Sequence, residues 1–422
     1  MLFRSIATLS KTGLLVENRR QDSDSPVFFV LPVVQSFMQQ HGRIGKGIRQ
    51  NILLSCSQYV LDHRHQNPAL AAEDVNIQAI LCGSPTTEHS NMLSDKVIDA
   101  LVEFSWYRCD NAKPNLEVAK HAASMAKAFG NKKYIASSLW CLGLAYHDLG
   151  EPYAAYDHTQ EAYQLYNALL PDNPELQLSC CRCGIEMVNE ARLTFKDHDK
   201  VLSLARDVEK QAATVSDNDT HALSLVVLGR VLIQFGDQQE ALRHLEHVKQ
   251  MGISSLRYDV YFWIAHVHYH EKRLPEALDA AEEAWKISEP ANNLSNRVEN
   301  SFLLGTILFS VNRDTEAWKY MEISLTNSLE FGNHRDSARA LEYMGYGYLR
   351  RGDYLNAYNA YEAAGENYLG TDLEEPGCTR CKHNMAKIKD MQKTPDLNVG
   401  FKRPRNDINW PSLFYPGAAA SV

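Results

Sequence analysis

The chain has 422 residues and a formal net charge of −9. Its length suits two or three ordinary domains or one extended repeat array. The acidic balance, with a pI near 6.0, excludes a general nucleic-acid binder, because such a protein needs a basic stripe to displace counterions from phosphates. The nine cysteines are an odd number and lie mostly within apolar helical patterns, which indicates reduced thiols rather than a disulfide framework.

The N-terminal segment 1–46 lacks the pattern found in the rest of the chain. Its sequence predicts a helix over 2–11, two β-strands over 14–18 and 27–31, and a helix over 32–40. The longest apolar run, 27–34, is far shorter than the roughly 20 residues that a membrane helix needs. We therefore expect a cytoplasmic protein with a small α+β cap at 1–46. Helical periodicity over 48–64 and 68–82 predicts a helical adaptor at 47–93.

A two-helix unit recurs from residue 94 to residue 393. Aligning the units on a small residue in the first helix gives intervals of 41, 45, 36, 40 and 40 residues. The aligned residues are Gly143, Gly184, Gly229, Ala265, Gly305 and Gly345. All but the second are followed twelve residues later by alanine, at Ala155, Ala241, Ala277, Ala317 and Ala357. Small residues let two helices approach closely, so each unit is predicted to be a helix hairpin that buries its apolar face by stacking on its neighbours.

The units follow the pattern L-G-x-x-[YL]-x-x-x-[GN]-x-x-x-x-A, as in VVLGRVLIQFGDQQEALRHLEHV and LLGTILFSVNRDTEAWKYMEIS. This pattern resembles the tetratricopeptide repeat, whose usual period of about 34 residues is lengthened in this chain. The resemblance implies an all-α, right-handed superhelix, that is, an α-α solenoid of about six or seven hairpins over 94–393. A last helix over 376–391 is predicted to cap the array, and the proline-containing segment 394–422 is predicted to be a disordered tail.

The N-terminal segment resembles a second known module. The order helix, strand pair, helix and the phrase LPVVQSFM at 31–38 resemble the winged-helix segment of NB-ARC and NACHT signalling NTPases. The resemblance implies that the chain is the sensor arm of such a protein. No GxxxxGK[ST] motif occurs, and GRIGKG at 42–47 has the wrong spacing and no hydroxyl for magnesium. We therefore expect no NTPase core here, which leaves open a truncated NTPase or a free-standing protein.

No pattern in the sequence supports an enzyme. His266, His268 and His270 lie close together, but Val267 stands where a zinc-protease motif has glutamate, and no further ligand is evident. The CxxCxH run at 378–383 lacks a second pair of ligands at zinc-finger spacing. We expect free thiols packed between helices, and no catalytic residue, metal or cofactor.

The tetratricopeptide resemblance implies a concave groove lined by the first helices. In that family the residues three before and one, four and five after the aligned small residue point into the groove. We predict that the groove binds a protein or peptide, in the form of an extended segment or a helix with apolar anchors and some acidic groups. The predicted partner-binding residues are Trp140, Arg230, Phe262, His266, Tyr269, Phe302, Phe309, Glu342, Tyr346 and Arg350.

One partner is excluded and one alternative function stays open. Members of the family that bind chaperone tails have lysine and asparagine where Trp140 and Leu144 stand, so capture of a chaperone C-terminus is not expected. The alternative function is a transcription-regulatory module that binds DNA through the N-terminal cap. The segment 32–40 has no lysine or arginine to contact phosphates, which counts against this alternative.

Overall fold

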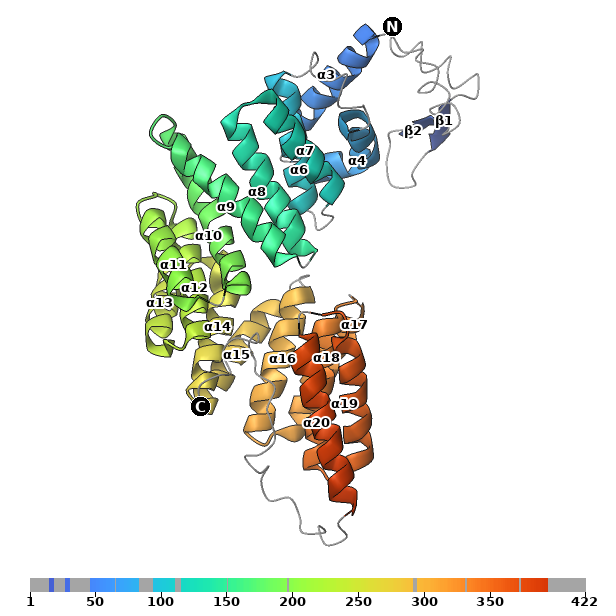
Figure 1. The fold of residues 1–422 in the computed structure, drawn as a ribbon, viewed down its shortest axis with the longest axis vertical. Helices are drawn as coiled ribbons and strands as arrows, with labels where there is room; N and C mark the ends of the chain where they lie inside the picture. Colours follow the sequence, from blue (N-terminus) through green and yellow to red (C-terminus); the bar gives the residue numbers. More distant parts are fainter. Residues whose placement is uncertain are drawn as a thin grey trace. The chain divides into compact units, whose positions relative to one another are not determined.

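The computed structural model describes residues 15–18, 27–30, 46–64, 66–82, 94–110, 115–149, 151–195, 197–290, 294–330, 332–371 and 373–393. They belong to two compact units, Met1–Gly150 and Glu151–Val422 (Figure 1). The predicted repeat array, 94–393, thus begins in the first unit and continues through the second. Among the described residues, no helix is both long and apolar enough to cross a membrane.

The two predicted N-terminal strands are present. Strand β1 (Leu15–Asn18) pairs antiparallel with β2 (Val27–Val30), with Leu15 opposite Val30 and Asn18 opposite Val27. The helices predicted over 2–11 and 32–40 lie outside the described residues. The structure therefore contains the strand pair of the predicted winged-helix cap, and this pair alone does not make a winged helix.

The first unit contains five described helices. They are α3 (Lys46–Asp62), α4 (Asn67–Cys82), α6 (Asp95–Asp110), α7 (Leu116–Phe129) and α8 (Lys132–Asp148). Helix α6 packs against α3, α7 and α8, and the shared core includes Val60, Leu70, Ile77, Ile98 and Phe104. Helices α3 and α4 correspond to the predicted adaptor helices at 48–64 and 68–82.

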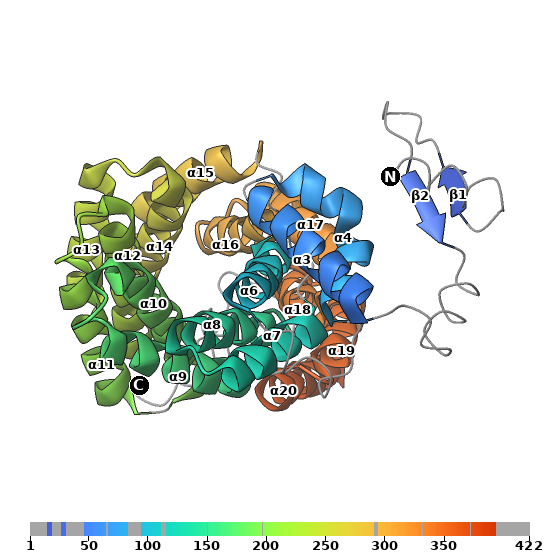
Figure 2. The ribbon, with the colours of Figure 1, turned by 90° about the horizontal axis from the view of Figure 1, so that it is seen from above.

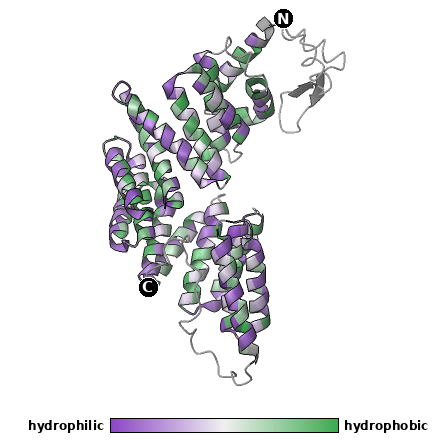
Figure 3. Ribbon diagram, viewed as in Figure 1, coloured by the Kyte–Doolittle hydropathy of each residue, from purple (hydrophilic) through white to green (hydrophobic). Residues whose placement is uncertain are grey.

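The second unit is a series of helix hairpins. Its helices are α9 (Pro152–Leu169), α10 (Gln177–Thr194), α11 (His198–Ala212), α12 (Asn218–Phe235), α13 (Gln238–Met251), α14 (Arg257–His270), α15 (Leu274–Ser288), α16 (Leu294–Ser310), α17 (Asp314–Glu330), α18 (His334–Arg350), α19 (Tyr354–Tyr368) and α20 (Glu374–Lys393). Short 3₁₀ turns, Pro174–Leu176 and Ser254–Leu256, precede α10 and α14. The hairpins α12–α13, α14–α15, α16–α17 and α18–α19 match the predicted units. Hydrophobic and hydrophilic residues alternate along their helices (Figure 3).

The aligned small residues lie where the two helices of a hairpin meet. A Cβ atom on Gly229 would lie 3.3 Å from Leu245, and one on Gly345 would lie 3.1 Å from the Tyr361 ring. The alanines of the second helices, Ala241, Ala277, Ala317 and Ala357, are all fully buried. The close helix approach predicted from the register is therefore confirmed for the hairpins of the second unit.

Local sequence signals set the ends of these helices. Gly352 adopts a left-handed conformation with φ of 75°, which ends α18, and the Asp353 carboxylate accepts a hydrogen bond from the backbone N–H of Asn356 at the start of α19. In the same way, Gly236 ends α12 in a left-handed conformation, and the Asp237 carboxylate accepts a backbone hydrogen bond at the start of α13. The Gly-Asp turn predicted at 352–353 is confirmed.

The cysteines are packed as thiols. All nine are free, and Cys141, Cys180, Cys181, Cys183 and Cys381 are fully buried. Burial raises the pKa of Cys181 to about 11, so its sulfur stays protonated and unreactive at neutral pH. The prediction of free thiols packed between helices is confirmed.

Candidate interaction surface

The first helices of successive hairpins form one continuous layer in the second unit. Helix α12 contacts α10 and α14, and α16 contacts α14 and α18, whereas the second helices approach one another less closely. Figure 2 shows α12 and α14 lying between α13 and α16. A stack whose first helices are closer together than its second helices curves toward the first helices. We call the surface of α12, α14, α16 and α18 at positions −6, −3, +1, +4 and +5 from the aligned small residue the first-helix face.

Six of the ten predicted partner-binding side chains stand at positions of the first-helix face but are buried there. Their exposed fractions lie between 1% and 6%. They are Phe262, His266, Phe302, Phe309, Glu342 and Tyr346. In the free protein these side chains pack between hairpins and expose little surface to a partner, so their direct contact with a partner stays a prediction.

Aromatic packing between neighbouring hairpins explains most of this burial. The Arg339 guanidinium lies 4.2 Å from the centre of the Phe302 ring, and the Tyr343 ring meets Phe302 edge-on. Phe309 packs edge-on against Trp318 and lies 6.3 Å from Tyr346, ring centre to ring centre. Large side chains at the predicted groove positions thus fill the space between one hairpin and the next.

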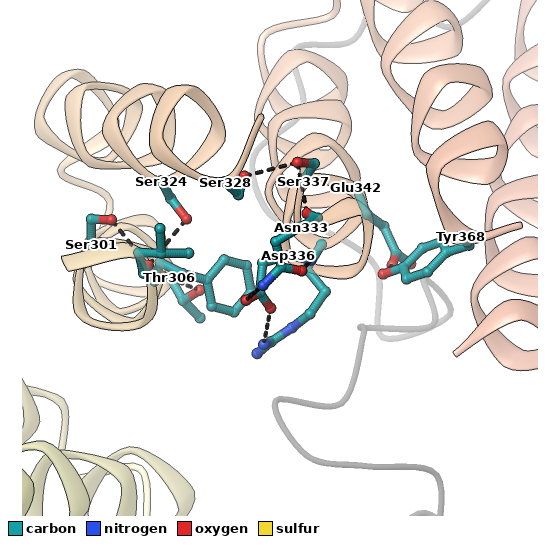
Figure 4. Close-up of polar contacts among 12 residues, drawn as sticks. Ser301, Thr306, Ser324, Ser328, Asn333, Asp336, Ser337, Glu342 and Tyr368 are labelled. Carbon is teal, nitrogen blue, oxygen red and sulfur yellow. Dashed lines mark hydrogen bonds and ion pairs between the residues drawn. The ribbon is translucent and has the colours of Figure 1, made fainter. Parts of the chain in front are cut away.

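Glu342 has a structural partner. Its carboxylate accepts two hydrogen bonds from the Arg380 guanidinium, at 2.9 and 3.0 Å, and a third from the Tyr368 hydroxyl at 2.7 Å. Figure 4 shows Glu342 and Tyr368 pointing toward each other from neighbouring helices. Because Arg380 lies on α20, this buried ion pair joins the last helix to the last hairpin.

His266 is also an interior residue. It is 4% exposed and lies edge-on to the Phe262 ring at 4.7 Å. Burial lowers its pKa well below the usual value, so the imidazole is neutral at physiological pH. Across the described parts of the chain, no group of three or more His, Cys, Asp and Glu side chains is placed to hold a metal ion.

Four of the predicted side chains are partly exposed. Trp140 belongs to the first unit, where it packs edge-on against Trp106. The Tyr269 hydroxyl lies 3.4 Å from that of Ser310. Arg350 donates a hydrogen bond to the Phe309 carbonyl oxygen at 2.6 Å. It makes further polar contacts with the hairpin that contains Phe309.

Arg230 differs from the other three. Its guanidinium lies 5.0 Å from the centre of the Trp263 ring, and its Nε is buried without a hydrogen-bond partner. No ion pair satisfies it within the described residues. A partly buried guanidinium that rests on an aromatic ring and has unused donors can bind an anionic or carbonyl group.

Two carboxylates that the sequence prediction misses share a face with Arg230. Asp259 on α14 and Glu299 on α16 each lie six residues before their aligned small residue, and Arg230 lies one residue after its own. Seven residues make about two helical turns, so Arg230 lies on the same side of its helix as the two carboxylates but two turns further along it. Asp259 is half-buried and Glu299 is exposed. No described residue forms an ion pair with either carboxylate.

Desolvation raises the pKa of both carboxylates. For Asp259, attraction to Arg230 offsets only part of the effect of burial. For Glu299, loss of hydration is the largest cause of the raised pKa, and the neighbouring Asp336 carboxylate adds to it. Three arginines oppose this shift, namely Arg230, Arg339 and Arg335.

The raised pKa of Glu299 predicts a pH-dependent stability difference. A carboxylate whose pKa is raised by folding contributes stability below its unfolded pKa and loses that contribution as the pH rises through its folded value. We therefore expect Glu299→Gln to raise the melting temperature at pH 7 and to leave it unchanged below about pH 4, where wild-type Glu299 is protonated. Thermal unfolding of both proteins at the two pH values measures this. A variant that melts below wild type at pH 7 would contradict it.

Comparisons with known proteins identify the fold but not a family. No protein-family model matches the chain, and no curated protein matches it either. Among solved structures, a Rap protein complexed with competence and sporulation factor is 12% identical, covers 82% of this chain and 98% of its own, and has a TM-score of 0.53. The fold is a tetratricopeptide-like helical solenoid.

Two further solved structures share this solenoid. The apo form of RapI is 10% identical, with a TM-score of 0.51 over 64% of this chain and 97% of its own. Aspartyl phosphate phosphatase F from Bacillus subtilis is 14% identical, with a TM-score of 0.51 over 80% of this chain and 88% of its own. At such low identities the similarity concerns the solenoid alone. The function of this tetratricopeptide-like chain has to be argued from its own residues.

Proposed function

We propose that this chain is a non-enzymatic protein-interaction scaffold that binds a peptide segment or a helix on the first-helix face of its second unit. The main support is the group of Arg230, Asp259 and Glu299, whose charges are partly desolvated and have no ion-pair partner among the described residues. Unpaired charges in such surroundings are costly, and a folded protein retains them mostly where a ligand completes them. Trp263 and Tyr269, both half-buried on α14, add aromatic surface of the kind found at interface hot spots.

The proposal revises the residue set predicted from the sequence. Arg230 and Tyr269 stay as candidate contacts, together with Asp259 and Glu299. The buried aromatic residues support the surface from behind, since they fix the spacing of the hairpins that carry these groups. Trp140 and Arg350 stay predictions that no described contact tests.

Broader predictions from the sequence join this proposal. They are a winged-helix-like cap at 1–46, a helical adaptor at 47–93, a repeat array at 94–393, a role as the sensor arm of a signalling NTPase, and a cytoplasmic location. The alternative, DNA binding by the cap, concerns the segment 32–40, which lies outside the described residues. A duplex whose mobility shifts in a salt-dependent way with this chain would favour that alternative.

Peptide selection tests the proposal. The full chain, immobilised, is exposed to a display library of random 12-residue peptides, and an enriched peptide is synthesised and titrated. We expect Arg230→Ala to weaken its binding by about tenfold, the effect of losing roughly 1.4 kcal/mol at an interface centre. The matched control is Arg243→Ala, which removes an exposed arginine from the second helix α13. Failure to enrich any peptide, or equal losses in the two variants, would contradict the proposal.

A further inference from the structure

Two cysteine sulfurs meet between helices α6 and α8 of the first unit. The sulfur of Cys109 on α6 lies 3.4 Å from the sulfur of Cys141 on α8. It also lies 3.7 Å from the backbone carbonyl oxygen of Cys141, so one residue rests directly against the other. The two helices pack against each other (Figure 1). Because the sulfurs of a disulfide are about 2.0 Å apart, a small side-chain shift would bring this pair to bonding distance.

Helix α6 holds the Cys141 sulfur from two positions. The Ser105 hydroxyl, one helical turn before Cys109, lies 3.0 Å from the Cys141 sulfur. Residues four apart lie on the same face of a helix, so Ser105 and Cys109 present one face of α6 to Cys141. Cys109 also packs against an apolar cluster that includes Leu142 and Ala145 on α8. The two thiols are therefore held together by the packing of the unit.

The two thiols differ in their access to solvent. Cys109 is half-buried, so a small oxidant can reach its sulfur, whereas Cys141 is fully buried. An accessible thiol with a second thiol beside it is the arrangement in which oxidation of the first sulfur is followed by a disulfide to the second. Cys183 and Cys378 differ from this pair, since each thiol donates a hydrogen bond to a backbone carbonyl oxygen.

We propose that Cys109 and Cys141 are a reversible oxidation site, at which a peroxide joins the two thiols in a disulfide. The Cys109 sulfur attacks one oxygen of hydrogen peroxide, which breaks the O–O bond, releases water and leaves a sulfenic acid on Cys109. The Cys141 sulfur then attacks the Cys109 sulfur, and the sulfenic hydroxyl leaves with the Cys141 proton as a second water. The two sulfurs together lose two electrons, and the peroxide is reduced to two molecules of water. A dithiol reductant returns both thiols.

The disulfide would fasten α6 to α8. It closes a loop of the chain that runs from α6 through α7 to α8. Such a cross-link restricts the unfolded chain and limits the separation of the two helices during local opening. Oxidation should therefore stabilise these helices of the first unit. The inference concerns a site outside the proposed peptide-binding surface and does not depend on that proposal.

Peptide mapping of the full chain after peroxide treatment tests the inference. The native protein is treated with hydrogen peroxide, the peroxide is removed with catalase, and the remaining thiols are blocked with N-ethylmaleimide under denaturing conditions before digestion without reductant. We expect a linked pair of peptides that contain Cys109 and Cys141, which dithiothreitol separates. Hydrogen exchange in α6 and α8 should slow by about tenfold or more on oxidation and recover with dithiothreitol. Exchange in α18 and α19 should not change.

Two variants serve as controls. Cys109→Ser should remove both the linked peptides and the slowed exchange, and circular dichroism checks that this variant is folded. Cys378→Ala removes another half-buried cysteine, on α20, and should keep both effects. A wild-type Cys109 that stays a thiol, that stops at sulfenic or sulfinic acid, or that links to other cysteines as often as to Cys141 would overturn the inference. Exchange that slows equally in Cys109→Ser would also overturn it.

Discussion

Replacing Arg380 with methionine should lower the free energy of unfolding of the C-terminal hairpin and α20 by about 3–5 kcal/mol, because it leaves a buried carboxylate without its cation. Glu342 is 1% exposed, and two of the three hydrogen bonds that its carboxylate accepts come from Arg380. The remaining donor, the Tyr368 hydroxyl, cannot balance the charge. Hydrogen exchange of α19 and α20, with and without urea, measures the local loss of stability.

Two matched variants complete this test. Lys382→Met removes an exposed cation from the same helix and should change stability by less than about 0.5 kcal/mol. Combining Arg380→Met with Glu342→Leu removes both charges and should recover most of the loss, because an apolar pair no longer leaves a charge buried. Equal stability of Arg380→Met and Lys382→Met would show that the ion pair does not hold α20 in place.

A single added methyl group should weaken the packing of α20 on the solenoid. In Gly377→Ala the new Cβ would lie 2.5 Å from atoms of the Tyr368 ring, far inside normal contact distance. Tyr368 cannot move aside easily, because it is fully buried and its hydroxyl is bonded to Glu342. We expect a loss of about 1–3 kcal/mol in the unfolding free energy of this segment, the usual effect of overpacking.

The same substitution at a neighbouring glycine provides the control. In Gly365→Ala the Cβ would lie 3.7 Å from the Cβ of Cys381, an ordinary contact. Because alanine favours a helix over glycine, this variant should gain up to about 1 kcal/mol. Urea unfolding followed by circular dichroism compares the two proteins. If Gly377→Ala is as stable as Gly365→Ala, the close packing of α20 on Tyr368 is not as described.

The sequence was sufficient to predict the hairpins and their register. A small residue followed twelve positions later by alanine marks the contact between two helices, and both Gly229 with Ala241 and Gly345 with Ala357 lie at such contacts. Turn residues such as Gly352 mark helix ends through backbone conformation, which is a local property. Features that depend on local backbone geometry or on a repeating period can therefore be predicted from a single sequence.

The burial of the predicted groove residues could not be predicted from the sequence in the same way. Whether Phe302 and Phe309 face a ligand or the next hairpin depends on how closely hairpins stack, and the covering groups, Arg339 and Tyr346, come from about 40 residues further along the chain. The family register gives a direction for each side chain but not the distance to the next hairpin. The ion pair of Glu342 was missed for the same reason, since its partner Arg380 lies on α20.

The group of Arg230, Asp259 and Glu299 could have been found in part. Asp259 and Glu299 occupy the same position in successive units, two helical turns before the position of Arg230. Extending the set of groove positions by two helical turns toward the N-terminus of each first helix would therefore have included them. Their loss of hydration could not have been found, because it depends on groups from several helices that meet only in the folded solenoid.

The central claim is that a partner binds the first helices of the second unit. Hydrogen exchange measured by mass spectrometry, on the full chain with and without a peptide enriched from the library, tests it most directly. The account predicts that the peptide slows exchange in α12, α14, α16 and α18 and leaves exchange in α13, α15 and α17 unchanged. Slowed exchange confined to the second helices, or to the first unit, would contradict the account.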